Sequence, residues 1–325
     1  MSVSALRRYA PRRRPRTTAV LTALLLGVST LAGCADREDS APQEADDAGS
    51  FPVTVQADGA PSVTIEQRPG RIVSLSPSAT ETLYAVGAGE QVVAVDDQST
   101  YPEQAPRTDL SGLNVDPEAI LSHNPDLVVV YADADNKLAE TLGKAGAQTL
   151  VLPDATSLDA AYAQFELVGK ATGHADEGAD LARRTREELD KIVADTPKPE
   201  QPLSYFHELD PTYYTVTSAT FIGSVYDRFG LVNIADGDDP TASGGYPQLS
   251  AETIVEADPD FVFLADAQCC DQSPETVAKR PGWDTLSAVR ENRVIVLDED
   301  VASRWSPRVV DFARAVSAAV TPASS

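Results

Sequence analysis

Cysteine, basic residues and long apolar segments are all scarce in this sequence. Three cysteines in 325 residues cannot form a disulfide framework, so a small disulfide-stapled fold is excluded. The 26 lysines and arginines stand against 50 aspartates and glutamates, which gives a formal net charge of −24. A surface this negative repels polyphosphates, so we expect no binding of nucleic acid. Its apolar segments are too few and too short for a multi-span transporter.

Motifs of catalysis are also missing. The sequence contains no nucleophile elbow, no glycine-rich phosphate loop and no HExxH zinc helix. Its three histidines, His123, His174 and His207, stand in unrelated settings. His207 and Glu208 are adjacent, but two candidate ligands are too few to indicate a zinc site. We therefore expect no enzymatic activity, no cofactor and no metal centre.

The first 34 residues have the pattern of a secretion signal. Residues 1–33 carry six arginines and no acidic residue, and the arginines precede an apolar run from Ala19 to Ala32. An apolar run this short behind a basic segment is typical of a signal peptide and not of a membrane span. The run leads into Leu-Ala-Gly-Cys34, which resembles the lipobox of bacterial lipoproteins. The resemblance implies that Cys34 is the first mature residue and carries a lipid; the alternative is an ordinary cleaved signal followed by a chance cysteine.

A short acidic segment follows the signal. Residues 35–50 are nearly free of large apolar side chains, so they cannot bury a core. We expect residues 34–55 to form a disordered tether with a reach of roughly 25 Å. The folded part is then expected outside the cytoplasm, anchored by lipid to the outer face of the cytoplasmic membrane or to a periplasmic membrane surface.

Short apolar strands alternate with helical patterns in the rest of the chain. This alternation predicts an N-terminal α/β lobe at 56–157 and a C-terminal α/β lobe at 198–325, with parallel sheets covered on both faces. Residues 158–197 are helical almost throughout and are predicted to link the lobes. Their spacings Arg183/Glu187 and Arg186/Asp190 suit an exposed helix. We expect strands at 72–75, 91–95, 127–131, 148–152, 203–207, 261–264 and 294–296, and helices at 78–86, 117–123, 137–144, 221–229, 251–256, 276–289 and from 307.

A weak internal repeat relates the two lobes. Segments 116–130 and 250–264 share five of fifteen residues at an offset of 134, Glu118 and Glu252 among them. Each segment has the pattern of a capped helix, a Pro-Asp turn and a buried strand. The alternative is that any short helix-to-strand unit has this pattern. The matching caps favour two similar lobes.

Aromatic residues recur in the loops after the predicted strands, although the chain is only 6% aromatic. Ligands of parallel sheets bind beyond the carboxyl ends of the strands, so two lobes that face each other hold a ligand in the cleft between them. Aromatic rings with an arginine suit a large, flat or partly apolar ligand; the alternative is that single rings merely pack under the loops. The loop segments are 76–78, 98–101, 131, 206–208, 213–214, 244–246, 268–270 and 303–306.

Cys269 and Cys270 are neighbours in the chain. Adjacent Cα atoms lie about 3.8 Å apart, below the usual span of a disulfide. Two free thiols, a vicinal disulfide that stiffens the edge of the cleft, and ligation of a soft metal are the three alternatives. In an oxidising compartment we favour the vicinal disulfide.

Glu118 and Glu252 hold equivalent places in the first turns of equivalent helices. A carboxylate there interacts favourably with the positive end of the helix, which is sufficient reason for both residues on stability grounds. The alternative is that each lobe offers one exposed carboxylate to a partner protein.

These features together resemble a class III (cluster A-I) periplasmic binding protein, the iron-complex and vitamin B12 group that supplies ABC importers. The resemblance runs from about Pro52 to the C-terminus, and its most specific stretches are 71–81, 101–102, 116–131, 246–252 and 302–308. It implies two Rossmann-like lobes with mainly parallel sheets, bridged by one long helix that permits only modest closure. It also implies that Glu118 and Glu252 dock onto arginines of a permease dimer.

Within that family the sequence is most similar to the cobalamin-binding branch. Tyr131 and Tyr246 stand where tryptophans are often found, and the loop with Cys269 and Cys270 lies outside the usual pattern. The predicted ligand contacts are Ser76, Pro77, Tyr101, Tyr131, Phe206, Tyr246, Arg304 and Trp305.

We therefore expect a monomeric, lipid-anchored protein that captures a corrinoid between its lobes and delivers it to an ABC permease with its ATPase. A ferric siderophore or haem is the first alternative, because tyrosines and an arginine suit those ligands as well. An envelope lipoprotein enzyme would need a nucleophile–base pair or a metal cluster, and the sequence suggests neither. A scaffold without a small ligand would leave the loop aromatics unexplained.

Overall fold

The computed structural model describes residues 51–237 and 239–321. The predicted signal peptide, residues 1–33, and the predicted lipid attachment residue Cys34 lie outside the described residues, as does most of the predicted tether. Among the described residues, no helix combines the length and the apolar character needed to cross a membrane.

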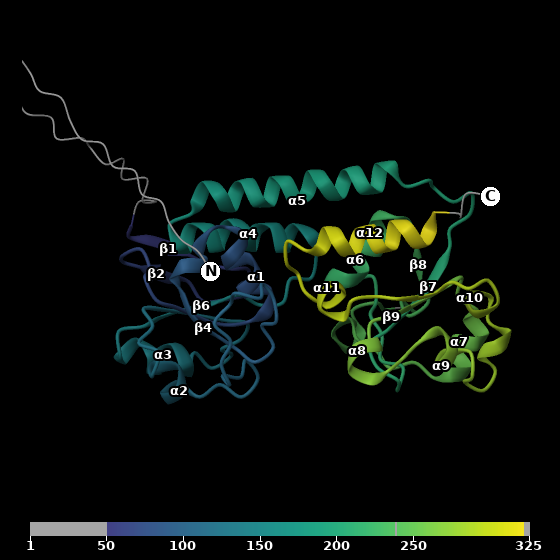
Figure 1. Ribbon diagram of the computed structural model, residues 1–325, viewed down its shortest axis with the longest axis horizontal. Helices are drawn as coiled ribbons and strands as arrows, with labels where there is room; N and C mark the ends of the chain where they lie inside the picture. Colours follow the sequence, from purple (N-terminus) through teal and green to yellow (C-terminus); the bar gives the residue numbers. More distant parts are fainter. Residues whose placement is uncertain (1–50, 238, 322–325) are drawn as a thin grey trace, which may run out of the picture. The chain divides into compact units, whose positions relative to one another are not determined.

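The N-terminal lobe is built on a four-stranded parallel sheet with the strand order β4-β3-β5-β6. Every residue of the central strands β3 and β5 is buried, as expected for a sheet covered on both faces. Apart from the 3-10 helix η1, which was not predicted, the elements agree with the predicted ones to within two residues at either end (Figure 1). They are β3 (Ile72–Leu75), α1 (Pro77–Ala85), the 3-10 helix η1 (Ala88–Gln91), β4 (Val92–Val95), α2 (Pro117–Leu121), β5 (Leu127–Val130), α3 (Lys137–Lys144) and β6 (Gln148–Val151).

The folded part begins earlier in the chain than predicted. Strand β1 (Val53–Val55) pairs antiparallel with β2 (Val63–Ile65), so residues 53–55 belong to the N-terminal lobe and not to the tether. An alternation of apolar and polar side chains over only three residues cannot be distinguished from a loop in the sequence. Packing of β1 against helix α4 (Leu158–Thr172) holds the hairpin in place.

The predicted helical segment consists of two helices, α4 and α5 (Ala175–Asp195), which are separated at Gly173. Helix α4 packs on α1 and β1 of the N-terminal lobe, whereas α5 packs on both α4 and α12 (Val309–Val320) of the C-terminal lobe (Figure 1). The prediction of one long bridging helix is therefore confirmed by α5. The backbones of α4 and α5 approach closely at two glycines: a Cβ atom on Gly169 would lie 2.8 Å from the Cα atom of Gly178.

The C-terminal lobe repeats the topology of the N-terminal lobe. Its parallel sheet has the order β10-β9-β7-β8, and when the strands of each sheet are counted along the chain both sheets have the order 2-1-3-4. The strands are β7 (Ser204–Glu208), β8 (Val232–Asn233), β9 (Phe261–Leu264) and β10 (Val294–Val296). The helices before α12 are α6 (Phe221–Arg228), η2 (Ala242–Gly245), α7 (Ala251–Ala257), α8 (Ala267–Cys270), α9 (Pro274–Val277), η3 (Trp283–Thr285), α10 (Ser287–Arg290) and α11 (Glu299–Ser303).

The repeated segments form the same local structure in both lobes. Asp116 and Ser250 cap α2 and α7 by accepting hydrogen bonds from backbone N–H groups of the first turn. The carboxylate of Asp126 accepts from the backbone just before β3, and that of Asp260 accepts from the first residue of β7. Each Pro-Asp turn therefore ties its helix to the start of the neighbouring strand, which confirms the repeat.

One predicted helix, over residues 276–289, is broken in the structure. Helix α9 ends at Val277, and Gly282, with a φ of 82°, starts the 3-10 turn that carries Trp283 into the core. A positive φ is a conformation that glycine adopts readily and that ends a regular helix. The short elements β8, α8 and α11 were not predicted, because two to five residues show no periodicity.

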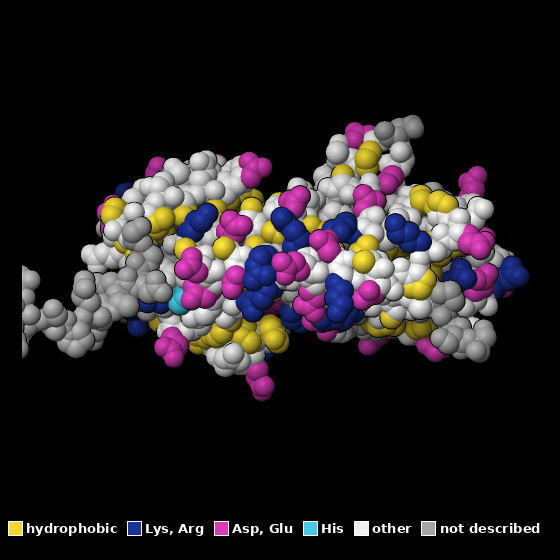
Figure 2. All heavy atoms as spheres, turned by 90° about the horizontal axis from the view of Figure 1, so that it is seen from above, with side chains coloured by type: hydrophobic (Ala, Val, Ile, Leu, Met, Phe, Trp, Pro, Cys, Tyr) yellow, Lys and Arg dark blue, Asp and Glu magenta, His cyan; other side chains and the backbone are white. Residues whose placement is uncertain are grey.

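Ion pairs tie α5 to its neighbours. The predicted pair within the helix, Arg183 with Glu187, is present at 3.0 Å. The predicted pair between Arg186 and Asp190 is wrong: Arg186 donates to Asp159 of α4 at 2.9 Å, and Asp190 accepts from an arginine of α6. Oppositely charged side chains on the neighbouring helices therefore replace the partner on the same helix. Figure 2 shows basic and acidic side chains intermixed on this face.

Candidate ligand-binding site

The loops after the strands of the two sheets lie against each other. The hydroxyl of Thr100, after β4, donates to the carboxylate of Asp300, after β10, at 2.6 Å. Arg304, at the end of α11, donates to the carboxylate of Glu81 on α1 at 3.0 Å and to the carbonyl oxygen of Gln98 at 2.9 Å. The carboxyl ends of the two sheets are therefore directed toward the region where the lobes meet. A ligand cleft was predicted in this region.

A second arginine from the C-terminal lobe joins this contact. Arg308 donates through Nε and Nη2 to the two oxygens of Glu81, at 2.9 and 2.5 Å, and hydrogen bonding to Glu81 raises the pKa of Arg308. The side chain of Glu81 is only 1% exposed, so without these arginines its charge would be buried and unpaired. We call the set Glu81, Thr100, Asp300, Arg304 and Arg308 the arginine junction.

Tyr101 lies at this junction, and two further predicted tyrosine contacts lie in other loops of the two lobes. The guanidinium carbon of Arg308 is 4.4 Å from the ring centroid of Tyr101, whose side chain is half-exposed. Tyr246 of the C-terminal lobe is also half-exposed, and burial together with the nearby Asp154 carboxylate, from the loop after β6, raises the pKa of its hydroxyl. Tyr131 directly follows β5 and is partly buried. Three of the predicted contacts therefore keep accessible aromatic surface.

Two predicted contacts are occupied within their own lobes. Phe206 is fully buried in the core, where its ring meets Trp283 edge-on with centroids 6.2 Å apart. The prediction that Phe206 contacts a ligand is wrong, because this position of β7 points into the core. Ser76 accepts from the N–H of Ala79 as the cap of α1 and is only 3% exposed, so little of its surface is accessible to a ligand. Pro77, which follows it, occupies the first helical position and is partly buried.

Arg304 and Trp305 join the lobes. Arg304 is 8% exposed, and its guanidinium donates to four acceptors, Glu81, Gln98, Thr100 and Asp300, so we correct its predicted role as a ligand contact. The indole N–H of Trp305 donates to Oε1 of Gln164 on α4 at 3.1 Å. Residues Arg304, Trp305 and Arg308 therefore contact the N-terminal lobe and α4 from the C-terminal lobe.

Sequence reasoning missed the part that Glu81 plays in joining the lobes. Glu81 lies in one of the motif stretches, but nothing in the sequence connects it to arginines more than 220 positions later. Leu113 is 77% exposed in the loop between β4 and α2. The backbone of this loop passes close to the end of β3, since a Cβ atom on Gly112 would lie 2.6 Å from the carbonyl oxygen of Leu75.

His207 and Glu208 have separate partners on opposite faces of β7. Nδ1 of His207 lies 2.9 Å from the hydroxyl of Tyr226, and complete burial lowers the pKa of His207 to about 3. Glu208 accepts from both terminal nitrogens of Arg280 at 2.5 Å. Consecutive strand residues point to opposite faces, so these two side chains do not converge on one point.

Cys269 and Cys270 form a disulfide on α8 in the structure. The N–H of Cys269 donates to Oε2 of Glu299, the first residue of α11, at 3.2 Å. Helix α8 comes after β9, so the cysteine pair lies at the carboxyl edge of the C-terminal sheet. The disulfide thus lies beside the helix that supplies Arg304.

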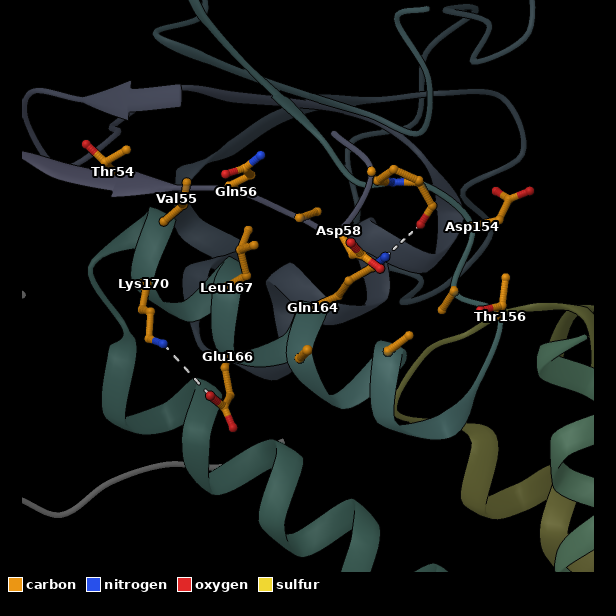
Figure 3. Close-up of a pocket in the computed structure, with 16 residues that line it drawn as sticks. Thr54, Val55, Gln56, Asp58, Asp154, Thr156, Gln164, Glu166, Leu167 and Lys170 are labelled. Carbon is orange, nitrogen blue, oxygen red and sulfur yellow. Dashed lines mark hydrogen bonds and ion pairs between the residues drawn. The ribbon is translucent and has the colours of Figure 1, made fainter. Parts of the chain in front are cut away.

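One cavity lies between the N-terminal lobe and α4, and a second lies between the two lobes. The larger, about 590 Å³, lies among residues 54–59, the loop 153–156 and α4 (Figure 3). At one end the amide of Gln164 donates to the carbonyl oxygen of Pro153 at 2.6 Å, and farther along α4 Lys170 pairs with Glu166 at 3.8 Å. The smaller cavity, about 430 Å³, is lined by Tyr101 of one lobe and by Arg308 with residues of α11 and α12 of the other.

Glu118 and Glu252 are exposed in the first turns of α2 and α7. Within the part of the chain that the structure describes, neither glutamate has an ion-pair partner. Each lobe therefore presents one carboxylate at the start of an equivalent helix.

Comparison with known proteins agrees with this architecture. Residues 72–301 match the model of the periplasmic binding protein family. An ABC transporter substrate-binding lipoprotein of Bacillus subtilis is 32% identical over 93% of this chain and 96% of its own length. A cobalamin-binding protein of Halobacterium salinarum is 31% identical over 90% of this chain and 81% of its own length.

A solved structure shares the fold. The periplasmic haem-binding protein of Roseiflexus sp. RS-1 is 25% identical, covers 77% of this chain and 97% of its own, and superposes with a TM-score of 0.64. The family match, the two parallel sheets of equal topology and the single bridging helix agree with one another. The chain therefore belongs to the periplasmic binding protein family and is an extracytoplasmic substrate-binding protein of an ABC importer.

Proposed function

We propose that the chain binds a corrinoid between its lobes and delivers it to the permease of its importer. The observation that carries this proposal is the placement of accessible tyrosines on both lobes, Tyr101 and Tyr131 on one and Tyr246 on the other. Aromatic faces suit a large, flat and partly apolar macrocycle. The similarity to a cobalamin-binding protein over most of the chain supports the same ligand class.

Haem, one of the two iron-containing alternatives, needs an axial ligand from the protein. Haem iron is commonly held by an axial histidine, cysteine, methionine or tyrosine. His207 is fully buried, and His174 bonds to Arg68 and Gln91, so these two histidines are engaged by the protein itself. Of these residue types, tyrosine is the one that the predicted ligand contacts of this site contain.

Titration calorimetry of the full-length lipoprotein in detergent with cyanocobalamin, haem and a ferric hydroxamate siderophore tests the proposal. We expect saturable binding of one equivalent of cyanocobalamin, with the other two at least about tenfold weaker. Tighter binding of haem or of the siderophore would assign the site to that ligand and contradict the corrinoid proposal.

We further propose that Glu118 and Glu252 dock onto basic residues of the permease dimer. Exposed and unpaired carboxylates on equivalent helices of the two lobes support a symmetric pair of contacts. Replacing both by lysine is expected to abolish binding to the permease complex in vesicles while leaving ligand affinity unchanged. The matched control replaces Glu140 on α3 and Glu256 on α7, both also exposed, by lysine. Equal loss of binding in both double variants would contradict a specific role for Glu118 and Glu252.

The third part of the proposal is a lipid anchor on Cys34. The lipobox-like sequence before it and the lipoprotein relative support this assignment. Mass spectrometry of the mature N-terminus is expected to show a diacylglycerol adduct on Cys34, and Cys34→Ser is expected to release the protein from membranes. An unmodified Cys34, or a mature chain that begins elsewhere, would contradict the anchor.

A further inference from the structure

Tyr101 is held by a series of contacts that begins at Glu81. The guanidinium of Arg308 lies against the ring of Tyr101, 4.4 Å from its centroid, and donates in its own plane to both oxygens of Glu81. A guanidinium bound through two parallel donors has a fixed plane, and a fixed plane presents a flat face to an aromatic ring. Glu81 therefore fixes the plane of the Arg308 guanidinium and, through this contact, the position of the Tyr101 ring.

The loop that carries Tyr101 is also tied down on its other side. Arg304 donates to the carbonyl oxygen of Gln98 and to the hydroxyl of Thr100, at 2.9 and 3.2 Å. Glu81 accepts from Arg304 as well, so one buried carboxylate holds both arginines that contact this loop. The two arginines come from the C-terminal lobe, whereas Glu81 and Tyr101 belong to the N-terminal lobe.

We infer that Glu81 is a positioning residue for ligand binding, which acts through Arg308 to orient the ring of Tyr101. This inference rests on the proposed function and deepens it. Glu81 does not touch the ligand, because its side chain is only 1% exposed. Tyr101 is 47% exposed, so Arg308 covers part of its surface and the remainder is free to stack on a flat macrocycle.

A double-mutant cycle on ligand affinity tests the connection between Arg308 and Tyr101. In the full-length lipoprotein, Arg308→Met is expected to weaken cyanocobalamin binding about tenfold when Tyr101 is present, and less than about twofold in Tyr101→Leu. Glu81→Gln is expected to behave in the same way. Equal losses in both backgrounds would mean that Arg308 and Glu81 act independently of Tyr101, which overturns the inference.

Arg293 supplies the matched control. Its guanidinium lies 5.4 Å from the ring centroid of Phe261, at the amino end of β9, whereas the arginine junction lies beyond the carboxyl ends of the strands. Arg293→Met removes an arginine stacked on an aromatic ring in the C-terminal lobe and is expected to leave cyanocobalamin affinity unchanged. If Arg308→Met does not fold, Arg308→Lys replaces it in the cycle. Lysine keeps the charge beside Glu81 and removes the planar face, so the same Tyr101-dependent loss is expected.

A measurement without ligand separates this inference from the proposed function. Hydrogen exchange of the amides of residues 98–105 is expected to be faster in Arg308→Met and Glu81→Gln than in the unaltered protein, and unchanged in Arg293→Met. Unaltered exchange in the first two variants would overturn the positioning role. If the unaltered protein binds none of cyanocobalamin, haem and the siderophore, the proposed function fails, and the exchange rates still decide the role of Glu81.

Discussion

His207 is a titratable side chain that folding encloses completely. Burial lowers its pKa to about 3, against about 6.5 in an unfolded chain, so between these values only the unfolded chain takes up the proton. The free energy of unfolding should therefore fall as the pH drops below about 6.5, by up to about 1.4 kcal/mol per pH unit from this residue. His207→Gln should show a shallower loss between pH 7 and pH 5 in denaturant unfolding. Parallel pH profiles of the two proteins would contradict this account.

Asp266 makes the free energy of unfolding depend on pH in the opposite direction. It is fully buried, its two oxygens have no hydrogen-bond partner among the described residues, and burial together with the Glu208 carboxylate raises its pKa to about 8. Folding keeps Asp266 protonated where the unfolded chain ionises, so this residue lowers stability increasingly as the pH rises from about 4 to about 8.

The prediction is that Asp266→Asn stabilises the protein, and by more at pH 8 than at pH 5. The difference between the two pH values should exceed about 1 kcal/mol. The exposed Asp271, in the same loop, provides the matched control for replacing an aspartate by asparagine. A gain from Asp266→Asn that is equal at both pH values would show that ionisation is not the cause.

At the level of the helices, α4 and α5 can cross this closely because Gly169 and Gly178 at the crossing have no side chains. A Cβ atom on Gly178 would lie 2.8 Å from the carbonyl oxygen of Phe165 and 3.0 Å from the Cα atom of Gly169, and both are backbone atoms that cannot rotate away. Gly178→Ala should therefore force the helices apart and destabilise the fold by about 1–3 kcal/mol.

For Gly143 we expect substitution by alanine to have the opposite effect on stability. Gly143 lies inside α3, and a Cβ atom there would meet nothing within 4 Å. Gly143→Ala should stabilise the protein by up to about 1 kcal/mol, because alanine loses less backbone entropy in a helix. Thermal unfolding of the two variants checks both expectations; a stable Gly178→Ala variant would show that the crossing is not sterically fixed.

Local patterns were enough to predict most of the strands and helices. The apolar runs of β3, β5 and β9 are bounded by turn residues, and the caps Asp116 and Ser250 mark the starts of their helices. Residues 276–289 were mispredicted, since nothing in a helical apolar pattern shows that Trp283 must turn into the core. Elements of two to five residues carry too little pattern to be found at all.

The candidate site was predictable only in part, for a related reason. Tyr101 and Tyr246 were predicted as contacts because ligands of parallel sheets bind in the loops beyond the strands. Arg304 was misassigned because its partner Glu81 lies 223 positions earlier in the chain. A charge contact between two lobes depends on how the lobes are joined, and neither sequence stretch contains that information. The prediction for Phe206 was wrong because the sequence does not show which face of β7 points into the core.

At the scale of the whole molecule, two lobes of the same topology meet through the carboxyl ends of their sheets. The bridging helix α5 and the arginine junction join them at separate places. A buried carboxylate on one lobe that is neutralised by arginines of the other resists separation, because opening the contact would leave a charge unpaired. We expect the two lobes to change their relative position only slightly when ligand binds.

The central claim is that one ligand is held by both lobes together. The most direct test is the affinity of the full-length lipoprotein for cyanocobalamin after substitution on each side, with Tyr101→Ala in the N-terminal lobe and Tyr246→Ala in the C-terminal lobe. Val232→Ala, at a half-exposed residue of strand β8, serves as the control. Each tyrosine substitution should weaken binding about tenfold, and the control should not. Loss of affinity from one lobe only, or from neither, would contradict a site shared between the lobes.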